Sequence, residues 1–103
     1  MKDGKIIYND INVDKQNLIL IITNIIPFYS NKNFHKKITI CNKWITLLNI
    51  RPLQTEYDSH EIFNLQEILN DSANINLSFG NFEIGKLSMN LLFKVGELFN
   101  KDN

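Results

Sequence analysis

The sequence predicts an α+β domain dominated by antiparallel β-sheet, with about six strands and one helix in the order strand, strand, strand, strand, helix, strand, strand. Three observations lead to this prediction. Residues 18–26 are almost continuously apolar and rich in isoleucine. Apolar residues alternate with others around residues 42–43 and again over residues 75–95. Only residues 59–70 show a clear helical spacing, so we expect a curled sheet or small barrel with one covering helix.

A single domain is expected over residues 1–103. A chain of 103 residues is close to the commonest domain size, and 44% of its residues are hydrophobic, which is enough for one core. No Gly-, Ser- or Pro-rich stretch divides the chain.

The first two strands are expected at residues 5–13 and 18–26, joined by a polar turn at residues 14–17. The second run is apolar on both faces and rich in β-branched side chains, which is typical of a buried central strand, although a helix also fits the pattern. Pro27 then limits further pairing in a sheet.

A hairpin is expected around a two-residue turn at Asn42-Lys43, with Arg51-Pro52 ending its second strand. This register sorts the side chains onto two faces. One face holds Ile38, Ile40, Ile45 and Leu47, and the other holds Thr39, Cys41, Trp44 and Thr46.

The predicted helix begins with a capping signal. Asp58 is the expected N-cap, and Glu61 stands three residues later, as in a capping box. The apolar residues that follow recur at helical spacing: Ile62, Leu65, Ile68 and Leu69.

The last two strands are expected on either side of a turn at Gly80-Asn81. Apolar residues occupy alternate positions over 75–79, continue at even positions to residue 84, and change to odd positions from residue 87 to residue 95. Such a change across Gly85 predicts a β-bulge. A helix from Ile84 onward is the alternative, because Leu87, Leu91, Val95 and Leu98 also have helical spacing.

No catalytic centre is expected, and we predict that the protein is not an enzyme. His35 and Cys41 would lie about 20 Å apart on one strand, too far for a nucleophile and its base. Glu56, Asp58 and His60 could offer metal ligands, but Asp58 already serves as the N-cap, so we expect neither a metal nor a cofactor.

A cytoplasmic location without membrane association is expected. No apolar run typical of a signal peptide follows the first five residues. The longest apolar stretch, residues 18–26, is far shorter than the ~20 residues of a membrane helix. The only cysteine, Cys41, cannot form an internal disulfide.

The formal net charge is zero, but the charges are separated along the chain. Residues 31–55 carry only basic residues: Lys32, Lys36, Lys37, Lys43 and Arg51. Residues 56–85 carry only acidic ones: Glu56, Asp58, Glu61, Glu67, Asp71 and Glu83.

This charge layout has three interpretations. The two segments can lie side by side and offset each other. Alternatively, the acidic helix binds another protein, as in a small inhibitor or immunity protein, through Glu56, Asp58, Glu61, Glu67 and Asp71. The third interpretation is weak nucleic-acid binding through Lys32, Lys36, Lys37, Lys43, Trp44 and Arg51, which five positive charges support poorly. The leading hypothesis is a non-enzymatic protein-binding module, and a homodimer is left open.

One local stretch resembles a known family. Asn76-Leu77-Ser78-Phe79-Gly80-Asn81 is similar to the Asp/Asn-x-Ser-x-x-Gly segment of PilZ domains, with Arg51 at a suitable distance as the single counterpart of their paired arginines. The resemblance implies a degenerate PilZ-like β-barrel with a signalling or ligand-binding role, cyclic di-GMP being the ligand of that family.

Overall fold

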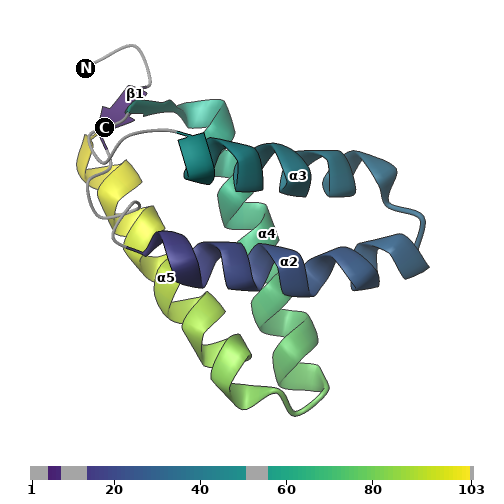
Figure 1. Cartoon of the computed structure of the whole chain (residues 1–103). Coiled ribbons are helices and arrows are strands. Elements are labelled where there is room, and N and C mark those ends of the chain that lie inside the picture. Colours follow the sequence, from purple (N-terminus) through teal and green to yellow (C-terminus); the bar gives the residue numbers. More distant parts are fainter. Residues whose placement is uncertain (1–4, 8–13, 51–55, 103) are drawn as a thin grey trace.

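The computed structural model describes residues 5–7, 14–50 and 56–102. Within these residues the chain forms four helices and two short strands, arranged as two helical hairpins that cross each other (Figure 1). The elements are β1 (Lys5–Ile7), α2 (Lys15–Asn31), α3 (His35–Ile50), β2 (Glu56–Asp58), α4 (Ser59–Ser78) and α5 (Phe82–Asp102). The α2–α3 hairpin packs on the α4–α5 hairpin mainly where α2 meets α4.

The predicted fold class, α+β with mostly antiparallel sheet, is wrong. The described residues contain only one strand pair, in which β1 runs antiparallel to β2 with Ile6 opposite Tyr57. Neither a curled sheet nor a small barrel is present in this part of the chain. Of the strand expected at 5–13, residues 5–7 are a strand and residues 8–13 lie outside the described residues.

The segment predicted to be a buried strand, residues 18–26, belongs to α2. Its buried side chains follow helical spacing: Leu18, Ile21, Ile22, Ile25 and Tyr29. The isoleucine-rich run was misleading because β-branched residues lower helix propensity by only tenths of a kcal/mol (about 0.5), which packing of an apolar face easily outweighs. Pro27, expected to limit the strand, lies inside this helix and is exposed.

The hairpin predicted around Asn42-Lys43 is also wrong, because these two residues lie in the middle of α3 and are exposed. Cys41, Trp44 and Leu48 form the buried stripe of that helix. Apolar residues alternate with others over only four positions on each side of Asn42-Lys43, and the expected turn has no glycine. So short a pattern fits a helix as well as a hairpin, and it did not distinguish the two structures.

The predicted helix at residues 59–70 is confirmed and continues to Ser78 as α4. The capping box is confirmed as well. The Glu61 backbone N–H donates to Asp58 Oδ1 at 2.8 Å, and the Asp58 N–H donates to Glu61 Oε1 at 3.1 Å. The strand expected at 75–79 is wrong, because helical packing continues through Ala73 and Asn76, both buried.

The strands expected after Gly80 form one helix, α5, so the alternative of a helix from Ile84 onward was the right one. Gly80 has φ +81° and lies in the turn between α4 and α5, where glycine adopts the left-handed conformation without strain. Gly85 is not a bulge. A Cβ built on it would lie 2.7 Å from Leu77 Cγ, so glycine here allows α5 to approach α4 closely.

The core lies between the two hairpins and is centred on α4, which contacts α2, α3, α5 and β2. At the end where α4 begins, the rings of Trp44 and Tyr57 stack with centroids 5.1 Å apart, and both side chains are buried. No helix in the described part of the chain combines the length and apolar character that a membrane span requires.

Candidate binding surfaces

A buried polar network joins three helices. Asn76, fully buried on α4, donates from Nδ2 to Ser72 Oγ at 3.1 Å and to Asn24 Oδ1 of α2 at 3.2 Å. Ser72 Oγ lies 2.8 Å from Ser88 Oγ of α5, whose hydroxyl donates to the Ile84 carbonyl at 2.8 Å. Since the Ser88 proton is engaged there, Ser72 must donate to Ser88. The network therefore specifies how the helices pack, because each polar group has a partner.

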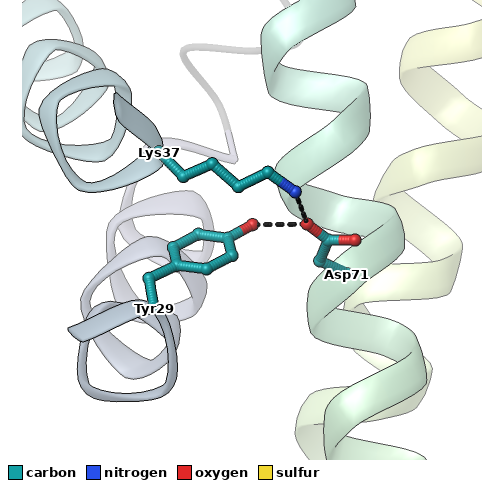
Figure 2. Close-up of polar contacts among 3 residues, drawn as sticks. All are labelled: Tyr29, Lys37 and Asp71. Carbon is teal, nitrogen blue, oxygen red and sulfur yellow. Dashed lines mark hydrogen bonds and ion pairs between the residues drawn. The ribbon is translucent and has the colours of Figure 1, made fainter. Parts of the chain in front are cut away.

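A polar clamp, defined as Tyr29, Lys37 and Asp71, joins α2, α3 and α4 (Figure 2). The Tyr29 hydroxyl donates to Asp71 Oδ2 at 2.7 Å, and Lys37 Nζ lies 2.9 Å from the same oxygen. Burial, followed by the hydrogen bond to Asp71, raises the pKa of Tyr29 well above its ordinary value. Lys37 Nζ also lies 5.4 Å from the centroid of the Tyr29 ring. The clamp therefore connects the α2–α3 hairpin to α4 of the α4–α5 hairpin.

The predicted acidic surface is largely engaged inside the molecule. Asp58 and Glu61 form the capping box, and Asp71 belongs to the polar clamp. Glu67 is exposed, and the side chain of Glu56 lies outside the described part of the chain. These five residues therefore do not gather into one outward-facing acidic patch in the described structure. The role of these five residues in partner binding stays a prediction, and it now depends mainly on Glu67, which is exposed.

The predicted basic patch is divided in a similar way. Lys32, Lys36 and Lys43 are exposed, whereas Lys37 is held in the polar clamp. Trp44 is only 2% exposed, so it offers no ring on which a base could stack, and Arg51 lies outside the described residues. A shallow hollow of ≈ 510 Å³ lies beside the start of α3, lined by Asn33, Phe34, His35, Lys36 and Lys37.

Within the described structure, the residues considered above as a nucleophile, a base or metal ligands do not come together in one site. Cys41 is fully buried, and burial together with Asp71 raises the pKa of its thiol to about 12, which keeps it protonated at neutral pH. Asp58 and His60 are both exposed at the start of α4. No group of three metal-ligating side chains is found among the residues that the structure describes.

The structure reveals an exposed apolar surface that the sequence pattern had concealed. Phe82, Met89 and Phe93 of α5 are 59%, 38% and 64% exposed. Their spacings of seven and four residues place them on one face of the helix, which we call the outer face of α5. The predicted strand had put Met89 and Phe93 on the same side as Leu91 and Val95. The helix separates them, because Leu91 and Val95 point into the core.

The PilZ-like interpretation is wrong for the fold. The segment 76–81 begins inside α4 with the buried Asn76 and ends in the turn between two helices, where the N–H of Asn81 donates to the Asn76 carbonyl at 2.8 Å. The small β-barrel that carries this segment in PilZ domains is absent from the described structure. The match in sequence is therefore a local coincidence in an asparagine-rich chain.

Comparison with protein-family models, with curated proteins and with solved structures found no match to this chain.

Proposed function

We propose that the protein is a non-enzymatic, cytoplasmic protein-binding module whose interface is the outer face of α5. The observation that carries the proposal is the exposure of Phe82, Met89 and Phe93 together on one helix face. Scattered exposed apolar residues are normal on protein surfaces, whereas several on one face mark an interaction site. Phe and Met are also enriched in protein interfaces.

The energetics suit a modest interface. Burial of a Phe or Met side chain contributes ~1.5–3 kcal/mol, so these three residues supply an apolar centre but little more than the cost of association. Polar contacts around them must provide the rest. Glu83, Lys86, Asn90 and Glu97 are exposed on α5 and supply such groups. An inhibitor or immunity protein, which acts by covering its partner, fits this description because it needs no catalytic group.

The acidic surface of α4 is the competing location for the interface. Glu67 and Asp58 are its exposed members, of which Asp58 also caps α4, and electrostatic steering by acidic groups would accelerate association with a basic partner. The outer face of α5 is favoured because its large side chains would be desolvated on binding, whereas Asp58, Glu61 and Asp71 already have intramolecular partners.

Site-specific photo-crosslinking in cells tests the proposal. A photoreactive p-benzoylphenylalanine would replace Phe93 on α5, Glu67 on α4 or, as a control, Thr46 on the exposed side of α3. We expect a discrete covalent adduct with another polypeptide from position 93 and none from position 46. The adduct should disappear when Phe82 is also changed to Asp. Adducts from position 67 alone would move the interface to the acidic surface, and adducts from none of the three would contradict the proposal.

A further inference from the structure

The outer face of α5 has a second property that points to its occupant. Phe82, Lys86, Met89, Phe93 and Gly96 recur at alternating spacings of four and three residues. This 3.5-residue repeat is the one that lets two helices pack along a continuous seam. It is distinct from the inward stripe of Ser88, Leu91 and Val95, which packs on the rest of the molecule. α5 also runs along one edge of the molecule (Figure 1).

From this repeat and from its flanking charges we infer that the outer face of α5 binds a second copy of the chain, with the two α5 helices antiparallel. The inference rests on the proposed function, since it names the partner of the same surface. The charges select the direction. Lys86 lies at one edge of the seam and Glu97 lies just outside that same edge; both are exposed, and the ion pairs found among the described residues include neither of them.

An antiparallel pair with its two-fold axis near residue 91 satisfies both charges. Residues whose numbers add to about 182 then lie opposite each other, so Met89 of one copy meets Phe93 of the second copy. Lys86 lies opposite Gly96, which has no side chain to block the lysine stem, and its ammonium comes beside Glu97. Two-fold symmetry forms each contact twice. A parallel two-fold pair would put this edge of one copy and the same edge of the second copy on opposite sides of the seam, so Lys86 would not come beside Glu97 of the second copy and neither charge would gain a partner.

The expected dimer is weak. A seam along one helix buries less than the ~1,200–2,000 Å² of a stable interface, so we expect a dissociation constant of roughly tens to hundreds of micromolar. Measurements must therefore extend to high protein concentration and include low ionic strength, where the exposed Lys86–Glu97 pairs are least screened.

Sedimentation equilibrium of the purified full chain tests the inference over about 5–500 μM. The apparent mass should rise with concentration from the monomer value of 12.0 kDa toward twice that value. Phe93→Asp should weaken association more than about tenfold, and Lys86→Glu should weaken it by roughly three- to tenfold, because it faces Glu97 of the second copy. The control Lys43→Glu, on the exposed side of α3, should leave the dissociation constant unchanged.

The charge-swapped variant Lys86→Glu/Glu97→Lys provides the decisive comparison. In a pair of identical copies the swap restores both ion pairs, so association should return close to the wild-type value. A wild-type chain that stays monomeric throughout, or a swap that restores nothing, would overturn the inference. A monomer that still forms a position-93 adduct with a different polypeptide rejects the second copy and retains the proposed function, whereas a monomer without any such adduct rejects both.

Discussion

Gly85 of α5 lies close to α4, and the space beside it is filled by Leu77. A Cβ at this position would meet Leu77 Cγ and Cδ2 at 2.7 Å and the Leu77 backbone nitrogen at 3.2 Å. Gly96, on the same helix, has only the Gln66 amide nitrogen at 3.5 Å, an ordinary contact distance. Two glycines of one helix therefore have different roles, because only one of them is required by packing.

Alanine substitutions should separate these two roles. Gly85→Ala should destabilise the protein by about 1–2 kcal/mol, because the clash with Leu77 exceeds the gain in helix propensity. Gly96→Ala, the matched control, should be neutral or stabilising by up to about 1 kcal/mol. Urea unfolding at low micromolar concentration measures both changes. Equal changes in the free energy of unfolding for the two substitutions would show that the close contact between Gly85 and Leu77 does not contribute to stability.

Cys41 should make the stability fall at alkaline pH. Its pKa rises from an ordinary 9.0 to about 12 in the folded protein, so folding favours the protonated thiol. The resulting stabilisation is complete below pH 9 and is lost as the pH rises from about 9 toward 12. Tyr29, whose pKa is also raised, adds to the loss above its ordinary value of 10.0.

Urea unfolding at pH 8, 9, 10 and 11 would measure this effect. The free energy of unfolding of the wild type should decrease over this range, and Cys41→Ala should flatten the decrease while lowering the stability at every pH. Tyr29→Phe should change the slope mainly above pH 10. A wild-type stability independent of pH between 8 and 10 would contradict the role assigned to burial of Cys41.

At the scale of the elements, polar residues in the core decide how the helices pair. Asn76 donates to Asn24 of α2 and to Ser72 of its own helix, and its Oδ1 accepts from Asn81 Nδ2 at 3.2 Å. Ser72 continues the chain of hydrogen bonds to Ser88 of α5. Apolar contacts alone would allow these helices to slide by one turn, whereas a slide would break the network and leave buried polar groups unpaired.

Asn76→Ala should therefore cost about 1–3 kcal/mol, because it leaves buried hydrogen-bonding groups without their partners. Asn74→Ala is the matched control, since it makes the same change at an exposed position of the same helix. We expect the control to alter stability by less than about 0.5 kcal/mol. Chemical denaturation of both variants provides the measurement, and a cost below that of the control would show that the network is dispensable.

At the scale of the whole molecule, two hairpins of opposite charge pack across each other. Residues 15–50 contain five lysines and no acidic residue, whereas residues 59–102 contain six acidic residues and three lysines. The polar clamp joins them through Lys37 and Asp71 at 2.9 Å, and a second ion pair joins Lys94 of α5 to Asp14, the N-cap of α2, at 2.6 Å. The pair of Lys37 and Asp71 supports the interpretation in which the basic and the acidic segments lie side by side and offset each other within the molecule.

A double-mutant cycle on the polar clamp would measure its contribution to hairpin packing. The side chains of Lys37 and Asp71 are 40% and 30% exposed, so we expect a coupling energy of only about 0.5–1 kcal/mol between Lys37→Met and Asp71→Asn. Because solvent reaches the pair, the coupling should shrink in 1 M salt, where the screening length is about 3 Å. Strict additivity of the two substitutions at low salt would contradict an energetic role for the clamp.

The start of α4 was predictable because its signals are local. Asp58 and Glu61 are three residues apart and form the capping box by themselves, and Ile62, Leu65 and Ile68 then show one clear period. Residues 18–26 have no such signal, since apolar side chains occupy both faces and fit a strand or a helix equally well. Over residues 87–95, the apolar residues satisfied a period of two and a period of 3.6 together.

Whether α5 has an exposed apolar face depends on which of these two periods residues 87–95 follow. As a strand, residues 87–95 would bury Met89 and Phe93 beside Leu91 and Val95. As a helix, they expose the first pair and bury the second, and the outer face of α5 appears. Of the residues named for their charge, Asp71 and Lys37 are less available to a partner, because they form an ion pair with each other although solvent still reaches both side chains.

The sequence by itself determined the capped start of α4 and the separation of basic from acidic residues along the chain, because each is a property of neighbouring residues. Tertiary structure alone decided that the isoleucine-rich and alternating segments are helices, that Gly85 is a packing contact and that α5 keeps an apolar face exposed. Their common cause is that local propensities differ by less than about 1 kcal/mol, whereas burial of a single large apolar side chain contributes more. Packing of apolar faces against each other within the chain therefore selects the secondary structure. The apolar faces that remain unpacked form the surface available to a second molecule.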